Sequence, residues 1–177
     1  MVHILLIQGA GLGASDALVA ALRQQAAPGV TIESPAMPQA DDPSAASWLP
    51  AIGAALQRQS QPFVAIGHSL GGSTLLQWLG ANPAPTNLRA VITAAAPYWG
   101  AGGWRAQEFA LPSGAAGQLG ALPCIILNGD ADDIVPVDHL ALYRAQLPQA
   151  EIRIVPGMDH LWSGGAATLL RLAARFA

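Results

Sequence analysis

Ser69 lies in the hexapeptide Gly67-His68-Ser69-Leu70-Gly71-Gly72, with one glycine two residues before it and another two residues after it. An apolar run at 63–67 precedes this hexapeptide, and a helical pattern at 71–80 follows it. A G-x-S-x-G sequence between a strand and a helix is typical of the sharp turn that exposes a nucleophilic serine. Side chains at the two glycine positions would collide with neighbouring backbone in such a turn. We therefore predict that Ser69 is a nucleophile, and the alternative is an ordinary glycine-rich turn.

A serine hydroxyl is a weak nucleophile at neutral pH, so a base must lie within hydrogen-bond distance of it. Among four histidines we favour His160, because it lies in a loop beyond the last expected strand. The active sites of open α/β sheets lie at the carboxyl ends of their strands. His139, at the start of a helix, is the main rival and is otherwise expected to be a surface or capping group. His3 begins the first strand at the opposite edge, and we expect a structural role for His68.

Three aspartates, Asp130, Asp132 and Asp133, follow a central strand and are candidates for the carboxylate that orients the base. Aspartate is also common in turns for local hydrogen-bonding reasons, and we expect Asp130 to bond within its own loop. Spacing alone does not separate Asp132 from Asp133. The order serine, aspartate, histidine along the chain is that of α/β-hydrolases.

Negative charge that develops on a substrate oxygen requires preorganised hydrogen-bond donors. The first expected donor is the main-chain N–H of Leu70, directly after the nucleophile. The second is the N–H of Ala10, in the loop after the first strand. These two groups are the predicted oxyanion hole.

The same loop has a second interpretation. The sequence Gly9-Ala10-Gly11-Leu12-Gly13-Ala14 fits G-x-G-x-x-A, and Glu33 ends the next strand about 20 residues later, where a ribose-binding acid would stand. A dinucleotide-binding protein is therefore an alternative. It leaves Ser69, the aspartate loop and His160 unexplained.

Short β-rich segments alternate with helical patterns, which predicts a mostly parallel sheet of about six strands with helices on both faces. We expect one domain over residues 1–177, folded as a compact three-layer α/β/α sandwich, a minimal α/β-hydrolase fold. The expected strands cover residues 2–7, 30–33, 63–67, 90–94, 123–128 and 151–155, the last near an edge because its apolar residues alternate. The expected helices cover residues 15–27, 47–58, 71–80, 137–147 and 165–176.

Residues 96–121 form the longest stretch without a helix or strand pattern, and they contain Trp99, Trp104 and Phe109. Such a stretch inside a compact domain is usually functional or mobile, so we expect a short lid-like or substrate-facing segment. Trp99, Trp104, Phe109 and Trp162 are candidate residues of an apolar substrate pocket. Ordinary packing is the alternative for each of them.

The composition argues against several functions. Hydrophobic residues make up 52% of the chain and charged residues 11%, which requires a large core such as a sheet covered on both faces. The net charge is −3 and the eight basic residues, all arginines, are scattered, so we expect no nucleic-acid partner. The absence of lysine excludes Schiff-base chemistry and a P-loop lysine.

The expected location is the cytoplasm, without membrane contact. Cys124 is the single cysteine, lies in an apolar run and permits no internal disulfide, which suits a reducing compartment. The first apolar run ends at Gln8 without a basic segment before it, so it is interpreted as a strand and not as a targeting segment. No apolar run approaches the ~20 residues of a membrane helix. Nothing in the sequence indicates the oligomeric state.

Beyond these motifs, the chain resembles the small serine hydrolases grouped with retinoblastoma-binding protein nine and YdeN. The shared residues include Met37-Pro38, then Trp48-Leu49-Pro50 at the start of a helix, and the aspartate and histidine loops. The resemblance implies an α/β-hydrolase with a Ser-Asp-His triad, and it favours Asp132 over Asp133. It also implies hydrolase activity without a cofactor or metal. Gln8 stands where many α/β-hydrolases carry histidine, and residues 96–121 match the family poorly.

Together these features predict acyl transfer to water. Ser69 attacks a small-molecule ester-like substrate, a carboxylester or a thioester, while His160 takes its proton and Asp132 stabilises the imidazolium. One alternative is a hydrolase-like fold that acts mainly as a protein-interaction module. Another keeps the triad but directs it to transfer or lyase chemistry.

Overall fold

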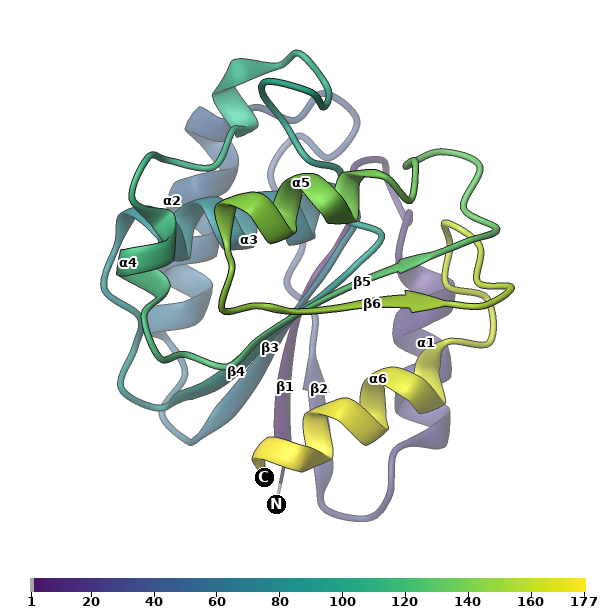
Figure 1. Ribbon diagram of the computed structural model, residues 1–177. Helices are drawn as coiled ribbons and strands as arrows, with labels where there is room; N and C mark the ends of the chain where they lie inside the picture. Colours follow the sequence, from purple (N-terminus) through teal and green to yellow (C-terminus); the bar gives the residue numbers. More distant parts are fainter. Residues whose placement is uncertain (1) are drawn as a thin grey trace.

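A computed structural model describes residues 2–177 and places six strands in one sheet (Figure 1). The strand order is β2-β1-β3-β4-β5-β6, and each neighbouring pair is parallel. The strands are β1 (Val2–Ile7), β2 (Val30–Glu33), β3 (Phe63–His68), β4 (Leu88–Ala94), β5 (Cys124–Gly129) and β6 (Glu151–Val155). The predicted parallel sheet is therefore confirmed, as is the edge position of β6.

Helices cover both faces of this sheet, which confirms the expected three layers. They are α1 (Asp16–Gln25), α2 (Ala45–Gln57), α3 (Leu70–Ala81), α4 (Ala115–Leu119), α5 (His139–Gln146) and α6 (Ala166–Ala173). In Figure 1, α1 and α6 lie on one side of the sheet and the other four helices lie on the other side. Within residues 2–177, no helix has the length and apolar character needed to cross a membrane.

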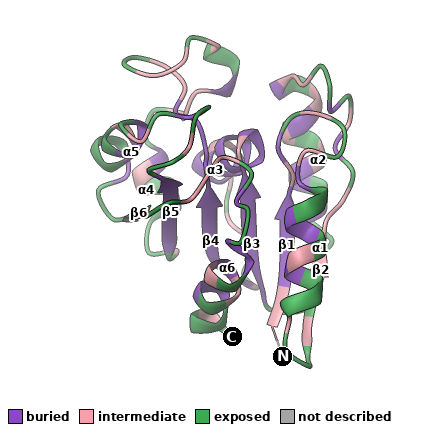
Figure 2. Cartoon of the chain, turned by 90° about the vertical axis from the view of Figure 1, so that its right-hand side faces the viewer, coloured by how far each residue is buried: buried purple, intermediate pink, exposed green. Residues whose placement is uncertain are grey.

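The apolar runs of the central strands are explained by this double cover. Along β1, Leu5 and Ile7 pack in the core under α2 to α5, whereas Ile4 and Leu6 pack in the core under α1 and α6. Because successive side chains of a strand point to opposite faces, a strand covered on both sides needs apolar residues at every position. Figure 2 shows the central strands as buried.

The start of α2 differs from the prediction by two residues. Ser44 is the N-cap, and its hydroxyl accepts a hydrogen bond from the N–H of Ser47 at 3.2 Å. The helix therefore begins at Ala45, and Pro50 lies in its second turn. Local capping by serine sets this boundary.

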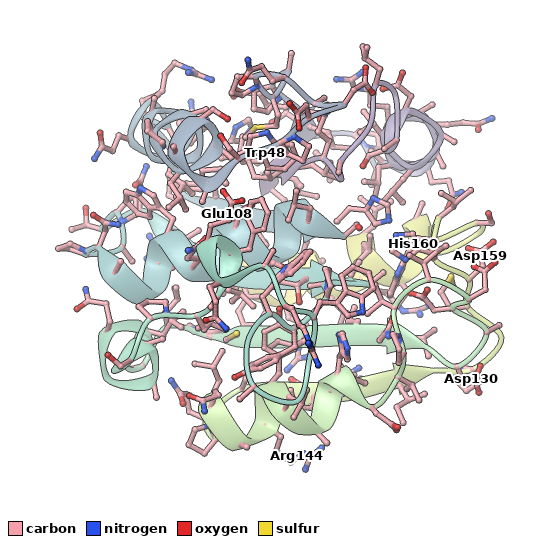
Figure 3. The ribbon with its side chains drawn as sticks, turned by 90° about the horizontal axis from the view of Figure 1, so that it is seen from above. Trp48, Glu108, Asp130, Arg144, Asp159 and His160 are labelled. Carbon is pink, nitrogen blue, oxygen red and sulfur yellow. The ribbon has the colours of Figure 1, made fainter. Side chains whose placement is uncertain are left out.

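Residues 96–121 contain more regular structure than the sequence suggested, and the expectation of a structureless stretch was wrong. A 3₁₀ turn covers Gln107–Phe109, α4 follows, and a β-bridge joins Trp99 to Trp104. Glu108 anchors this segment to α2, because its Oε2 accepts a hydrogen bond from the N–H of Ala45 at 2.9 Å (Figure 3). The short elements were missed because their stability comes from such contacts and not from local periodicity.

Candidate active site

Ser69 occupies a strained turn between β3 and α3. Its φ of 51° and ψ of −126° are rare for a residue with a side chain. A Cβ atom at Gly67 would lie 2.5 Å from the Cα of Gly72, and one at Gly71 would collide with the carbonyls of Ile7 and Gln8. The two glycines are therefore required where the sequence motif places them.

Three side chains from distant loops meet at this turn. The Nε2 atom of His160 lies 3.1 Å from the Oγ of Ser69, and its Nδ1 atom lies 3.0 Å from the Oδ2 of Asp132. Ser69 follows β3, Asp132 follows β5 and His160 follows β6, so all three lie at the carboxyl end of the sheet. An imidazole that is hydrogen-bonded to a carboxylate on one side and to a hydroxyl on the other can activate this hydroxyl as a nucleophile.

Asp132 is held rigidly, since its side chain is fully buried. Its Oδ1 atom accepts hydrogen bonds from the N–H groups of Ile134 at 2.9 Å and Val135 at 2.8 Å. Asp133 is exposed, so the geometry separates the two aspartates that spacing left open. The expectation that Asp130 bonds within its own loop was wrong. Asp130 accepts from the N–H of Gly157 at 2.6 Å and thereby joins this loop to the one that carries His160.

The other histidines lie outside this constellation. His3 bonds to Thr31 and Gln59 at the opposite end of the sheet. The expectation that His139 is a surface or capping group was wrong, because the residue is only 5% exposed. Its Nδ1 atom accepts from the N–H of Tyr98 at 2.9 Å, and burial lowers its pKa.

Both predicted oxyanion donors lie beside the nucleophile with their N–H groups unused by the helix or loop. Leu70 is the first residue of α3, where an N–H has no acceptor within the helix. Ala10 lies between two anchored neighbours: Gly9 donates to the Oγ of Ser15 at 2.9 Å, and Gly11 donates to the carbonyl of Ala40 at 2.7 Å. A Cβ at Gly9 would lie 3.1 Å from the Cβ of Ser69, so this loop contacts the nucleophile directly.

The loop between β2 and α2 supports the Ala10 loop, a role that the sequence analysis missed. The indole N–H of Trp48 donates to the carbonyl of Pro38 at 2.9 Å and fixes this loop against α2. Further along this loop, the carbonyl of Ala40 accepts from the N–H of Gly11, and the carboxylate of Asp41 accepts from the N–H of Leu12. The Met-Pro and Trp-Leu-Pro motifs were the available signal, and the structure gives them this physical meaning.

The same hydrogen bonds argue against dinucleotide binding. The N–H groups of Gly9, Gly11 and Leu12, which a pyrophosphate would need, already donate within the protein. Glu33 accepts from Arg58 at 2.8 Å and from Gln59 at 3.0 Å. Within residues 2–177, no group of three or more potential metal ligands is brought together.

The aromatic candidates for a pocket occupy different places. Trp162 is 1% exposed and packs in the core under α1 and α6, so its assignment to a pocket was wrong. Trp99 packs edge-to-face against Trp104 and at a tilt against Phe109, with 5.1 Å between ring centroids in each pair. A separate hollow of about 500 Å³ lies beside the base, and its lining residues are Ala131, Asp133, Ile134, Asp159, His160 and Leu161. Of these, Asp159 and His160 are labelled in Figure 3.

Comparisons with known proteins identify the family and the fold. The profile of the serine hydrolase family matches residues 19–165, most of the chain. Among solved structures, the ydeN gene product of Bacillus subtilis superposes with a TM-score of 0.77 at 15% identity, over 99% of this chain and 98% of that one. Est1E of Butyrivibrio proteoclasticus with bound ferulic acid gives a TM-score of 0.69 at 15% identity, over 99% and 88% of the two chains.

A third structure, the esterase domain of a Rhodothermus marinus protein, gives a TM-score of 0.65 at 21% identity, over 98% of this chain and 84% of that one. No curated protein sequence matches the chain. The structural likenesses, all at low identity, support the α/β-hydrolase fold, and the profile match covers well over half of the sequence. The chain therefore belongs to the serine hydrolase family.

Proposed function

We propose that the chain hydrolyses small ester-like molecules, carboxylesters or thioesters, with Ser69 as nucleophile, His160 as base and Asp132 as orienting acid. The observation that carries this proposal is the imidazole of His160, which lies 3.1 Å from the Ser69 hydroxyl and 3.0 Å from the Asp132 carboxylate. All three residues come from connections of one sheet, which supports a single catalytic domain over residues 1–177.

In the first half of the reaction, the Oγ of Ser69 attacks the substrate carbonyl while His160 takes its proton at Nε2. Asp132 accepts the Nδ1–H of His160, so the base has the tautomer that leaves Nε2 free to receive that proton. The N–H groups of Leu70 and Ala10 stabilise the oxyanion, and each such donor is worth about 3–4 kcal/mol in the barrier. His160 then protonates the leaving alcohol or thiol as the carbon–oxygen or carbon–sulfur bond breaks.

In the second half, water attacks the acyl group on Ser69. His160 takes a proton from this water, and the same oxyanion donors stabilise the second tetrahedral intermediate. Collapse of that intermediate returns the proton to Ser69 and releases the carboxylic acid. No cofactor is required for any of these steps.

The names of the structural neighbours favour ester bonds as the target. They include an esterase bound to ferulic acid, a pyrethroid hydrolase and an esterase domain. At 15–21% identity these proteins share the fold of this chain, and their names support the type of bond cleaved.

Active-site labelling together with an ester series tests the proposal. The wild-type protein should react with a fluorophosphonate and hydrolyse p-nitrophenyl esters, and Ser69→Ala should abolish both activities. Ser60→Ala, an exposed serine in the connection before β3, is the matched control and should keep both. An unlabelled wild-type protein would instead favour an interaction module, and ester products formed with an added alcohol would indicate acyl transfer.

A further inference from the structure

His68, directly before the nucleophile, is a buried histidine that the proposed reaction does not use. It is 1% exposed, and both of its ring nitrogens form hydrogen bonds. Nδ1 lies 2.8 Å from the Oγ of Ser15, and Nε2 lies 2.8 Å from the main-chain carbonyl of His160. Burial lowers the pKa of His68 to about 4, so the ring is neutral at neutral pH.

The direction of each hydrogen bond follows from the chemistry of the partners. A carbonyl oxygen can only accept a hydrogen bond. Nε2 of His68 must therefore carry the proton and donate a hydrogen bond to the main-chain carbonyl of His160. In a neutral imidazole Nδ1 is then an acceptor, so the Ser15 hydroxyl must donate to it. This leaves the Oγ of Ser15 free to accept from the N–H of Gly9, and the observed distance is 2.9 Å.

The position of Ser15 is independent evidence that its hydroxyl serves this chain of hydrogen bonds. Ser15 is the N-cap residue of α1, where a serine hydroxyl normally accepts from an N–H of the first helical turn. Here the side chain makes no capping hydrogen bond and turns instead toward Gly9 and His68. Its hydroxyl therefore connects two loops and does not stabilise its own helix.

We propose that His68 is a positioning residue that connects the loop of the base to the loop of the oxyanion donor. One imidazole holds the main chain at His160 directly and holds the main chain at Gly9 through Ser15. Gly9 immediately precedes Ala10, so the donor and the base are fixed relative to each other and to Ser69. This inference rests on the proposed function, because positioning matters only if these groups catalyse a reaction.

Two substitutions at His68 separate the two halves of the connection. His68→Gln keeps an amide donor near the position of Nε2, whereas His68→Asn keeps an amide acceptor near the position of Nδ1. We expect His68→Gln and Ser15→Ala each to lower kcat about tenfold with little change in KM, because both release Gly9. The double variant should be no slower than the slower single variant, since both changes break the same link.

His68→Asn should affect the base instead. We expect it to change the pH profile of kcat/KM and to slow fluorophosphonate labelling, whereas His68→Gln should leave the shape of the profile unchanged. Ser44→Ala is the matched control, because Ser44 is also an N-cap serine but does cap its helix. It should lower thermal stability and leave kcat unchanged. An active wild-type enzyme with unchanged kcat in both Ser15→Ala and His68→Gln would overturn the positioning role.

The hydrogen-bond chain can also be tested without any substrate. In protein with ¹⁵N-labelled histidine, long-range ¹H–¹⁵N spectra should show His68 as the Nε2–H tautomer at neutral pH, assigned by the loss of its signals in His68→Gln. A Nδ1–H tautomer or a charged ring would overturn the inference whether or not the enzyme is active. Absence of labelling in the wild-type protein, by contrast, would contradict the proposed function and would not alter this spectrum.

Discussion

The connections at the carboxyl end of the sheet, where Ser69 and His160 lie, contrast in charge with those at the amino end. They contain one of the eight arginines, Arg105, and nine of the eleven acidic residues. These acids are Asp16, Asp41, Asp42, Glu108, Asp130, Asp132, Asp133, Asp138 and Asp159. Toward the amino end the two remaining acids are both paired, Glu33 with Arg58 and Glu151 with Arg153 and Arg175.

Backbone strain is distributed in the same way. Among the described residues 2–177, the four non-glycine residues with positive φ are Gln39, Ser69, Ala95 and Trp162, and all four follow the carboxyl end of a strand. Of the four large hydrophobic residues that are exposed in the part of the chain that the structure describes, Leu12, Ile134 and Leu161 also lie in these connections. Within residues 2–177, one end of the sheet thus concentrates strain, acids that form no ion pair with arginine and exposed apolar groups, while the other concentrates ion pairs between arginine and glutamate.

Part of this contrast follows from the architecture, because helices begin at the carboxyl end of the sheet and finish at the amino end. Acids suit the positive start of a helix and arginines suit its last turn, where Arg23, Arg144 and Arg171 lie. The strain at Ser69 does not follow from helix dipoles. It persists because the surrounding packing imposes it, which is the usual situation at a functional site.

Asp132→Asn should produce the largest effect at the catalytic end. The Oδ1 atom already accepts from two N–H groups, so the new amide nitrogen would face Nδ1 of His160. The imidazole would then carry its proton on Nε2 and could not accept one from Ser69. We expect kcat to fall by up to about 10⁴-fold with little loss of stability. Steady-state kinetics and thermal melting will check this, and an active Asp132→Asn enzyme would contradict the assigned role.

The next largest effect compares two glycines, one at each end. A methyl group at Gly71 would collide with the carbonyls of Ile7 and Gln8, so Gly71→Ala should cost about 3 kcal/mol or more or prevent folding. Gly29, before β2, has a φ of 89° but open space around it, so Gly29→Ala should cost only about 1 kcal/mol. Urea unfolding of both variants measures the difference. Equal losses would show that strain is not concentrated beside Ser69.

The parts of this site that were predictable from the sequence are those with a local steric or topological cause. The turn at Ser69 requires glycines at fixed offsets, so its form is visible in six residues. His160 could be selected because parallel strands deliver their following loops to one edge. The structure brings Ser69 and His160 together as these rules indicated, whereas Asp132 was favoured over Asp133 only by the family resemblance.

The wrong predictions concern side chains whose surroundings come from distant segments. Whether His139 is exposed depends on Tyr98 and Trp104, and the partner of Asp130 is Gly157 in another loop. Trp162 lies only two residues from His160, but its side chain packs in the core under α1 and α6. Its φ of 59° is not indicated by any local pattern. Such contacts are properties of the assembled fold and not of a sequence window.

The acids beside His160 that form no ion pair with arginine should make the enzyme select substrates by charge. Asp133 and Asp159 line the hollow beside His160, and a negative potential there attracts cations and repels anions. We expect kcat/KM to be about tenfold higher for S-butyrylthiocholine than for the S-butyryl thioester of 3-mercaptopropanoate at low salt, and the ratio to fall as salt screens the charges.

The ratio should also decrease in Asp133→Asn, which removes one charge from the hollow. Glu33→Gln removes one charge from the far end of the molecule and is the matched control, with the ratio expected to stay unchanged. A salt-independent ratio would show that shape alone discriminates between the two thioesters.

The smallest expected effect concerns stability at the amino end. The hydrogen bond from Arg58 holds the pKa of Glu33 below its ordinary value, with Gln59 adding to this effect. A lowered carboxyl pKa means that the pair stabilises the fold above the ordinary glutamate pKa of about 4 and loses this contribution as the pH falls below it. Because the pair is partly exposed, Glu33→Gln should lower the free energy of unfolding by less than about 1 kcal/mol at neutral pH, and the difference from wild type should vanish in acid.

The measurement is a pH series of urea titrations, with Asp133→Asn as the control at an exposed acid of the catalytic end. We expect this control to leave the free energy of unfolding unchanged. An equal loss in both variants would contradict the contrast between the two ends of the sheet.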